Sequence, residues 1–429
     1  MTGLLIQNAR IPTSLLKTPH TTTDDFARVD ILLAKGIVAA IEPNGVLRAQ
    51  PATIDLDQGI VLPCFVDCHT HLDKGHIWPR RPNPDGTFMG ALDNAGLDRE
   101  ASWSARDVEA RMDFALRAAY VHGTAALRTH IDSIGKQIDI SWPVFSAMRE
   151  RWAGRITLQA APLFGIQMAT DPDHMSAVIA AVKAHGSGIL GAVTYMCPEL
   201  EDGLNVLFRA AITHGFDLDF HVDEASDPAV RSLERIAHAA LRHGFKGKIL
   251  CGHCCSLALQ TPEDEARIIA LVKEANIAIV SLPLCNMYLQ DREAGRTPRW
   301  RGVSSLHELK AAGVPVMVAS DNTRDPFYAY GDLDPLEVYR AATRIVHFDH
   351  PVGDWPRCVT QTPADIMGLP AHGRIGAGLP ADLVLTRARS WTELLSRPQS
   401  DRVVVRAGQV IERVLPDYRE LDELDGMHV

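Results

Sequence analysis

Residues 60–74 read IVLPCFVDCHTHLDK, an apolar stretch that ends in two histidines, His69 and His71. A short apolar run bounded by polar residues is typical of a strand that is buried on both faces. Successive side chains of a strand point to opposite faces, so histidines two positions apart share one face and can reach a single ion. An isolated pair of this kind is more often incidental than a metal site. Its interpretation therefore depends on the rest of the chain.

Seven further apolar segments follow, each separated from the next by a helical pattern or a loop. The helical patterns carry start and stop signals: Ser104 begins one that ends at Gly123, and Thr261 followed by proline begins another. Strands that alternate with helices predict a (β/α)₈ barrel of the α/β class. An open doubly wound sheet is the alternative, but the G-x-G-x-x-G pattern is missing after the first strand. The predicted strands are residues 60–68, 123–131, 156–164, 188–196, 217–222, 248–253, 277–284 and 314–320.

The two chain ends have a different pattern from the middle. Residues 4–11 and 29–43 alternate in a β-like way, and residues 381–388 and 401–414 read as two more strand-and-turn units. Both ends are therefore predicted to form β-structure. The final segment, residues 415–429, is acidic and is interpreted as a solvated end.

The composition is ordinary for a globular protein, since 46% of the 429 residues are hydrophobic and 22% are charged. The formal net charge of −10 argues against nucleic acid as the main partner, because a phosphate backbone requires a concentrated basic surface. The chain begins without a signal-peptide pattern, and no run reaches the ~18 apolar residues of a membrane helix. We therefore expect a cytoplasmic protein without a membrane span.

The eight cysteines have no regular disulfide spacing, and we expect them to be reduced thiols. Cys251, Cys254 and Cys255 surround His253 in the segment CGHCC, which invites a zinc-knuckle interpretation. Such a site needs a fourth ligand, usually from a second cysteine pair, and the chain has no other C-x-x-C. These cysteines are therefore interpreted as small apolar residues at a strand end.

Chemically reactive side chains follow several of the predicted strands. His221 lies at the end of the fifth strand with Glu224 just beyond it, His253 ends the sixth, and Asp321 follows the eighth. Catalytic groups of a (β/α)₈ barrel gather at this end of the strands. Each residue alone is more often a cap or a hydrogen-bonded structural group, but the set together with the two histidines of the first strand predicts one site. Imidazoles with a carboxylate suit zinc or ferrous iron.

The chain resembles the amidohydrolase superfamily over nearly its whole length, and within it most closely the bacterial cytosine deaminase group. The fold of that superfamily implies a distorted (β/α)₈ TIM barrel over residues 61–369. It also implies a small β-sandwich domain built from residues 1–60 and 370–429. The motifs that carry the resemblance are PCFVDCHTHLDKGH, LRTHID, FHVDEAS, GHCCSL, LPLCNMYLQDR, WRGVSSLHELKAAG, ASDNTRDPFYAYG and GRIGAGLPADLVL.

The resemblance also implies a catalytic site. One divalent metal ion, zinc or iron, would be held by His69, His71, His221 and Asp321. A single ion is expected because the end of the fourth strand, AVTYMCPE, has no lysine to bridge a second one. A metal-activated hydroxide would attack the substrate, and Asp321 would accept the water proton.

Two further residues have implied catalytic roles. Glu224 would protonate a ring nitrogen and carry a proton to the leaving amine, and His253 would stabilise the developing charge. The alternatives are that Glu224 is a surface carboxylate and that His253 is a fifth ligand.

The substrate-binding residues suggested by the sequence are Lys74, Leu163, Asn286, Asn322 and Phe327. Leu163 stands where the cytosine-reading enzymes have a glutamine, and Asn322 stands where they have an acid. A leucine lacks the amide that would pair with the pyrimidine edge, so cytosine itself is not the expected substrate. The segments ASDN and HLDK also resemble the corresponding motifs of the triazine-ring aminohydrolases of the same group.

We therefore expect a metal-dependent aminohydrolase, or deaminase, that releases ammonia from a small nitrogen heterocycle such as a cytosine-like nucleobase or a pterin. One alternative is release of an alkylamine from a triazine-type ring, and another is opening of a cyclic amide. A non-catalytic assembly protein on the same fold is a third alternative, but such proteins tend to lose the metal ligands. The sequence leaves the oligomeric state open, and a homo-oligomer is compatible with it.

Overall fold

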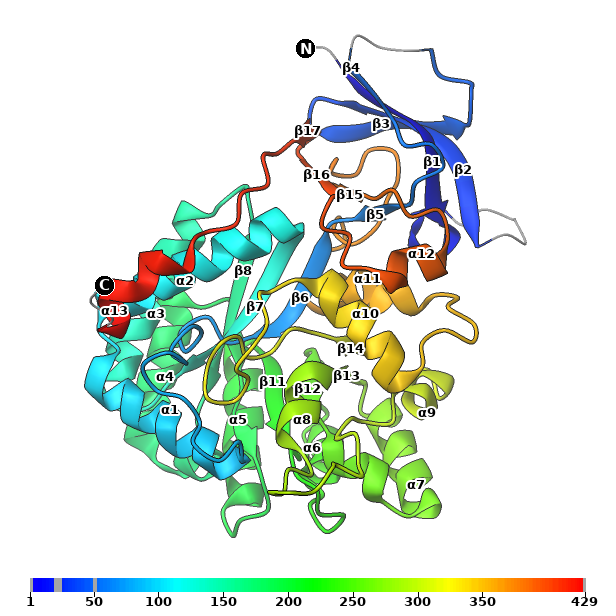
Figure 1. Ribbon diagram of the computed structural model, residues 1–429. Coiled ribbons are helices and arrows are strands. Elements are labelled where there is room, and N and C mark those ends of the chain that lie inside the picture. The colour runs from blue at the N-terminus through cyan, green and yellow to red at the C-terminus, as the bar shows by residue number, and fades with distance from the viewer. Residues whose placement is uncertain (1–2, 19–24, 49–51, 427–429) are drawn as a thin grey trace.

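The computed structural model describes residues 3–18, 25–48 and 52–426 (Figure 1). Its strands are β1 (Leu4–Pro12), β2 (Phe26–Ala34), β3 (Ile37–Pro43), β4 (Ala52–Asp55), β5 (Val61–Pro63), β6 (Phe65–Thr70), β7 (Thr124–Asp132), β8 (Thr157–Leu163), β9 (Ile189–Leu190), β10 (Val193–Thr194), β11 (Asp217–Val222), β12 (Ile249–His253), β13 (Ile277–Ser281), β14 (Val316–Val318), β15 (Leu383–Leu385), β16 (Val403–Arg406) and β17 (Gln409–Val410). Its helices are α1 (Phe88–Ser102), α2 (Ala105–His122), α3 (Gln137–Arg151), α4 (Pro172–His185), α5 (Leu200–His214), α6 (Ser232–Arg242), α7 (Pro262–Glu274), α8 (Pro283–Leu289), α9 (Leu306–Ala311), α10 (Pro335–Val346), α11 (Gln361–Ile366), α12 (Trp391–Ser396) and α13 (Asp422–Asp425).

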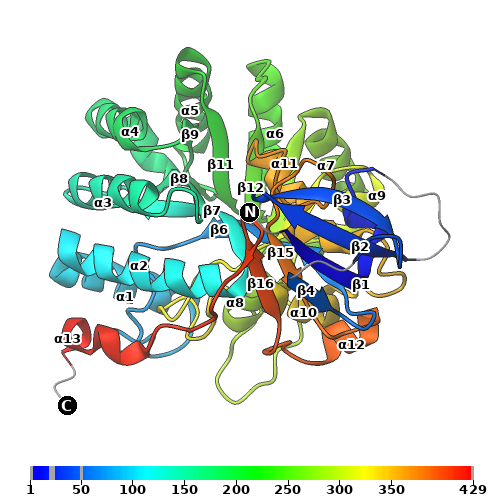
Figure 2. The ribbon, with the colours of Figure 1, turned by 90° about the horizontal axis from the view of Figure 1, so that it is seen from above.

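Two parallel sheets form the middle of the molecule. One has the strand order β6-β7-β8, and the other has the order β10-β11-β12-β13-β14 with β9 also paired to β11. The strand pairs in both sheets are parallel. Seen from above, α2 to α7 follow one another around these strands (Figure 2). The arrangement confirms the predicted α/β class, because parallel neighbours are joined by helical crossovers.

Two single bridges connect the parallel sheets to each other. Thr70 pairs with Asp321, and Gly165 pairs with Val193, both in parallel orientation. The backbone N–H of Asp321 also donates a hydrogen bond to the carbonyl of His69 at 2.9 Å. The end of β6 therefore lies beside the residues that follow β14, which brings the first and last predicted barrel strands together.

Two predicted strands are interrupted in the structure. The segment predicted as one strand over residues 60–68 is divided at Cys64 into β5 and β6, and β5 pairs antiparallel with β15 in a different sheet. The strand predicted over residues 188–196 is reduced to β9 and β10, with Gly191 between them. A Cβ atom at Gly191 would lie 1.8 Å from the carbonyl oxygen of Asp219, so β11 approaches too closely for any larger residue.

Helix ends follow the capping signals in the sequence. The side chain of Ser104 accepts a hydrogen bond from the first turn of α2, and Gly123 ends this helix with a left-handed φ of +100°. The strand predicted over residues 277–284 ends earlier, at Ser281, because Pro283 begins α8. Proline fits this position because its fixed φ suits the first helical turn.

Two four-stranded sheets, β3-β2-β1-β4 and β17-β16-β15-β5, lie at one end of the parallel sheets (Figure 1). The second sheet combines a strand that precedes β6 with three strands from the last part of the chain. Side chains from both sheets share one buried apolar cluster, which includes Ile6, Val29, Val61, Leu383 and Val405. The β-structure predicted for the two chain ends is therefore confirmed.

The cysteines agree with the prediction of free thiols. All eight lie among the described residues, and none forms a disulfide. Cys251, Cys254 and Cys255 are buried, and burial raises the pKa of each thiol. They behave as small apolar residues. No helix in the described part of the chain is long and apolar enough to cross a membrane.

The acidic segment that follows β17 is largely exposed, as its interpretation as a solvated end implies, but some of its side chains contact the rest of the molecule. It runs down to α13 beside α2 (Figure 1). Glu420 forms an ion pair with Arg117 of α2 at 2.6 Å, and the guanidinium of Arg324 lies 4.2 Å from the ring centre of Tyr418. Tyr418 donates a hydrogen bond to Asp332 at 3.3 Å. Acidic residues scattered along a segment gave no sign of these partners, which lie far away in the sequence. Residues 427–429 of the predicted tail lie outside the described residues.

His76 is a buried base whose ionisation opposes folding. Its side chain is 2% exposed, and neither ring nitrogen has a hydrogen-bond partner among the described residues. Burial, with the nearby charges of Arg324 and Arg111, lowers the pKa of His76 to about 3. In the unfolded chain the pKa of this histidine is about 6.5, so below that pH the unfolded state binds a proton that the folded state does not bind. Stability is therefore fully present above pH ~6.5 and is lost as the pH falls toward 3.

We expect His76→Phe to remove this loss of folding stability at low pH, because phenylalanine keeps the aromatic packing against Phe114 without a titrating group. At pH 5 the wild type should be destabilised relative to pH 7.5 by about 2 kcal/mol more than the variant. Urea unfolding of both proteins at the two pH values measures this difference. Equal pH dependence in the two proteins would contradict the expectation.

Candidate active site

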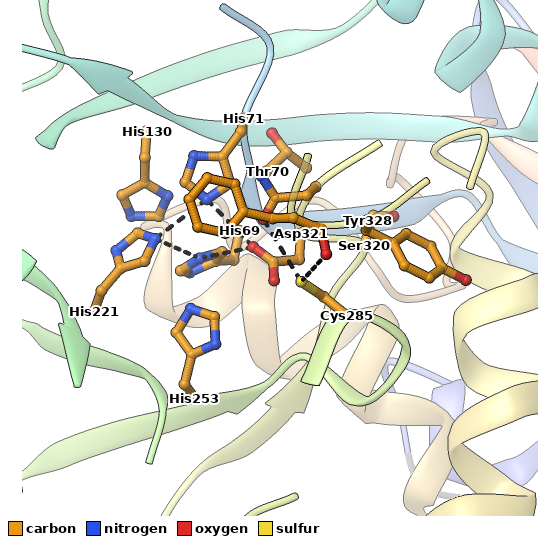
Figure 3. A network of polar contacts seen from close by, with 12 residues as sticks. His69, Thr70, His71, His130, His221, His253, Cys285, Ser320, Asp321 and Tyr328 are labelled. Carbon is orange, nitrogen blue, oxygen red and sulfur yellow. Dashed lines mark hydrogen bonds and ion pairs between the residues drawn. The ribbon is translucent and has the colours of Figure 1, made fainter. Parts of the chain in front are cut away.

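The four predicted metal ligands converge where the parallel strands end (Figure 3). His69 lies in β6 and His71 directly follows it, so the strand pleat turns both rings to one side. His221 lies in β11, and Asp321 follows β14. All four side chains are buried.

The ligand atoms form a compact group. Nε2 of His221 lies 3.1 Å from Nε2 of His69 and 3.2 Å from Nε2 of His71. Oδ1 of Asp321 lies 3.4 Å from Nε2 of His69 and 3.2 Å from Nε2 of His71. Atoms bound to a tetrahedral ion at about 2.1 Å lie about 3.4 Å from one another. The spacing therefore fits a cluster that could bind a metal ion.

The protonation state of two of these histidines supports the same interpretation. Nδ1 of His69, His71 and His221 has no hydrogen-bond partner among the described residues. Burial holds the pKa of His71 and His221 well below the usual value, which keeps their rings neutral. A neutral imidazole offers a lone pair, which is what a metal ion requires.

Unusual backbone conformations aim two of the side chains. His253 and Asp321 have φ values of +68° and +64°, in the left-handed region that non-glycine residues rarely adopt. Gly252 is required for a different reason: a Cβ atom there would lie 2.7 Å from Cε1 of His69. The imidazole of His69 thus occupies the space that any other residue at position 252 would need.

Glu224 and His253 lie next to this cluster, as the sequence predicted. Burial and the charge of Asp321 raise the pKa of Glu224 well above its usual value, so the carboxyl group can hold a proton. Burial lowers the pKa of His253 to about 4, so its ring is neutral at pH 7. Nδ2 of Asn286 lies 2.9 Å from both Oε1 of Glu224 and Nδ1 of His253. The interpretation of Glu224 as a surface carboxylate is wrong.

Lys74 is buried rather than exposed. Its ammonium group lies 2.8 Å from Oδ1 of Asp132, which also accepts from Arg99 at 3.0 Å through its other oxygen. Burial lowers the pKa of Lys74, but the charges of Asp132 and Asp73 outweigh it and hold the pKa above its usual value. The ring centre of Phe327 lies 5.5 Å from the ammonium nitrogen, so these two predicted substrate-binding residues face each other.

Two more of the predicted substrate-binding residues, Asn322 and Leu163, have different surroundings. The amide of Asn322 donates to Oδ2 of Asp325 at 2.7 Å and accepts from the thiol of Cys285 at 3.7 Å. Its polar atoms are therefore already engaged within the protein. Leu163 is buried at the end of β8, and Asp132 on β7 is its partner in the parallel register.

A buried polar chain lies next to the ligands, and sequence reasoning missed its members Asp219 and Arg128. The ring centre of His130 lies 4.1 Å from that of His69, and its Nε2 lies 3.1 Å from Oδ1 of Asp219. Arg128 donates to the other oxygen of Asp219 at 2.8 Å. Asp219 precedes His221 by two residues in β11, so both side chains point to one face. That spacing was the signal that could have revealed Asp219.

The chain matches known proteins along most of its length. The sequence model described as the amidohydrolase family matches residues 118–412. A pterin deaminase from Rhizobium rhizogenes is 55% identical over 423 residues, which are 98% of this chain and 97% of that protein. An N-isopropylammelide isopropyl amidohydrolase from Pseudomonas sp. is 24% identical and covers 83% of this chain and 87% of its own.

The structure also resembles a solved deaminase. The crystal structure of 5-methylcytosine deaminase from Klebsiella pneumoniae with 5-fluorocytosine superimposes with a TM-score of 0.82 at 25% identity. The match covers 96% of this chain and 98% of that one. The fold and the 55% identity to the pterin deaminase over nearly the full length indicate the same family as the histidines and the aspartate at the strand ends. The chain therefore belongs to the amidohydrolase family and is a hydrolase of carbon–nitrogen bonds.

Proposed function

We propose that the protein is a metal-dependent aminohydrolase that replaces the exocyclic amine of a pterin-type heterocycle with oxygen and releases ammonia. The observation that carries the reaction type is the position of Glu224 and His253, which both bond to the amide of Asn286. His253 also lies in one candidate metal-binding group with His69, His221 and Asp321. A proton carrier and a neutral hydrogen-bond donor at such a place suit attack of water on a ring carbon.

His69, His71, His221 and Asp321 would hold one divalent ion, zinc or iron. Three imidazoles and one carboxylate form a donor set that suits both ions, and their mutual distances fit it. The end of the fourth strand, residues 192–199, has no lysine for a second ion. When bound, the ion would lower the pKa of a nearby water toward about 7.

The surrounding residues have separate tasks in the proposed reaction. The neighbouring histidines overcome the effect of burial and hold the pKa of Asp321 well below its usual value, so the group is an ionised carboxylate that could ligate an ion. Glu224 would deliver its proton to a ring nitrogen, then take up a proton that the attacking water releases and pass it to the leaving amine. His253 would donate a hydrogen bond from Nε2, which is buried and has no partner among the described residues.

The substrate class follows from the relative that covers nearly the whole chain, a pterin deaminase. The side chains that we propose to contact the ring agree with a fused heterocycle rather than cytosine. Leu163 presents an apolar surface where an amide would read a pyrimidine, and Phe327 offers an aromatic face. Lys74 could contact a ring carbonyl, although Asp132 already binds its ammonium group.

We also propose the finer architecture. The bridges Thr70–Asp321 and Gly165–Val193 support closure of the parallel sheets into one distorted barrel that ends near residue 369. The shared apolar cluster supports a β-sandwich domain made from residues 1–60 and 370–429. Because β5 lies in a small sheet, the first boundary moves to Pro63.

Ammonia release tests the function. Metal-replete protein is incubated with pterin, cytosine and N-isopropylammelide, and ammonia, isopropylamine and the ring product are measured. We expect ammonia from pterin with the highest kcat/KM, together with the 2-oxo product. Turnover of cytosine or N-isopropylammelide without turnover of pterin would refute the substrate class. Inactivity toward all three would refute the deaminase.

A further inference from the structure

Asn286 bonds to both proposed catalytic groups at once. It lies in the first turn of α8, where its backbone N–H donates to the carbonyl of Leu282 at 2.9 Å, and its side chain is fully buried. Nδ2 is 2.9 Å from Oε1 of Glu224 and 2.9 Å from Nδ1 of His253. An amide nitrogen carries two hydrogens, so it can donate to both acceptors together.

We propose that Asn286 is a positioning residue that fixes the tautomer of His253 and the orientation of the Glu224 carboxyl group. The inference rests on the proposed function for the roles of these two groups. The sequence had suggested that Asn286 binds substrate, whereas its amide nitrogen is turned to the protein's own catalytic side chains.

The tautomer follows from the donor pattern. Since Nδ1 of His253 accepts the hydrogen bond of Asn286, the single proton of the neutral ring resides on Nε2. Nε2 is buried without a partner among the described residues, and one ring nitrogen of His253 lies within 4.8 Å of the ligand atoms of His69, His221 and Asp321. The ring can thus donate a hydrogen bond from Nε2 to a substrate bound beside the proposed ligands.

Loss of the amide would favour the wrong tautomer. Nδ1 of His253 lies 3.5 Å from Oε1 of Glu224. Without Asn286 between them, an Nδ1–H could donate directly to Oε1 of Glu224. Nε2 would then carry a lone pair and could no longer stabilise negative charge on the substrate.

The same amide also determines which oxygen of Glu224 carries the proton. Its bond to Oε1 makes this oxygen an acceptor, so the proton of the neutral acid resides on Oε2. Burial favours that neutral form. Asn286 therefore selects the oxygen that delivers the proton as well as the nitrogen that donates the hydrogen bond.

The variants Asn286→Asp and Asn286→Leu test this role, since both keep the approximate size and remove the paired N–H donors. We expect kcat to fall roughly 10²-fold in each, with KM and metal content close to wild type. Asn205→Asp is the matched control, because Asn205 also pairs with a histidine, His243, at 2.9 Å but lies on α5. This control should keep full activity.

Nitrogen NMR of the zinc-loaded protein supplies a readout that a merely structural role would not move. The signals of His253 are assigned by their loss in His253→Gln. In the wild type, Nε2 should show the signature of a protonated nitrogen and Nδ1 that of a free lone pair. In Asn286→Leu, the proton of His253 should be shared between the two ring nitrogens or should reside on Nδ1.

Three results would overturn the inference. One is an unchanged His253 tautomer in both variants, and another is a rise in KM without a fall in kcat, which indicates substrate contact. The third is a loss of activity that only follows a loss of thermal stability. The tautomer is measurable without any substrate, so this test stands even if pterin is not turned over.

Discussion

Replacing His221 with alanine is expected to reduce the divalent metal content to less than about a tenth of the wild-type content while the protein stays folded. Nε2 of His221 contacts both histidines of the first strand, at 3.1 and 3.2 Å, so its loss opens one side of the cluster. Pterin turnover should fall about 10⁴-fold or more, because the chemistry depends on the ion. Elemental analysis after dialysis measures the metal, and steady-state assays measure turnover.

His350→Ala is the matched control, since the His350 side chain is 93% exposed and belongs to no ligand group. Its metal content and activity should equal those of the wild type. If His221→Ala kept its metal, the proposed ligand set would be wrong. If it lost metal but kept full turnover, the ion would have no part in the reaction.

Glu224→Gln is expected to keep the metal and lose about 10³-fold in kcat. Glutamine has nearly the shape of the acid, so the ligand cluster should be undisturbed. Glutamine has no acidic proton to release. In the wild type, burial raises the pKa of Glu224, so its carboxyl group can hold the proton that the reaction uses. KM should change little, because the missing step is proton transfer rather than binding.

Glu293→Gln serves as the comparison, because Glu293 is an exposed acid whose partner is Arg296 on the surface. It should be as active as the wild type. Undiminished activity in Glu224→Gln would remove Glu224 from the mechanism. A loss of metal in that variant would instead make Glu224 part of the ligand environment.

The sequence determined the residues of the candidate site because their placement depends on one strand at a time. The spacing of His69 and His71 sets them on one face of a strand, and His221, His253 and Asp321 each stand at or after a strand end. Capping residues likewise marked the ends of α2 through contacts within a single turn. Such local rules act over a few residues, so they can be recognised without a tertiary structure.

The tertiary structure alone decided how these groups are connected. The bond of Asn286 to Glu224 and His253, the burial of Lys74 against Asp132, and the placement of β5 in a small sheet all join segments distant in the sequence. Periodicity tells which face of an element is buried but not which element covers it. Which donor meets which acceptor depends on distances between elements, and these are set only when the whole chain packs.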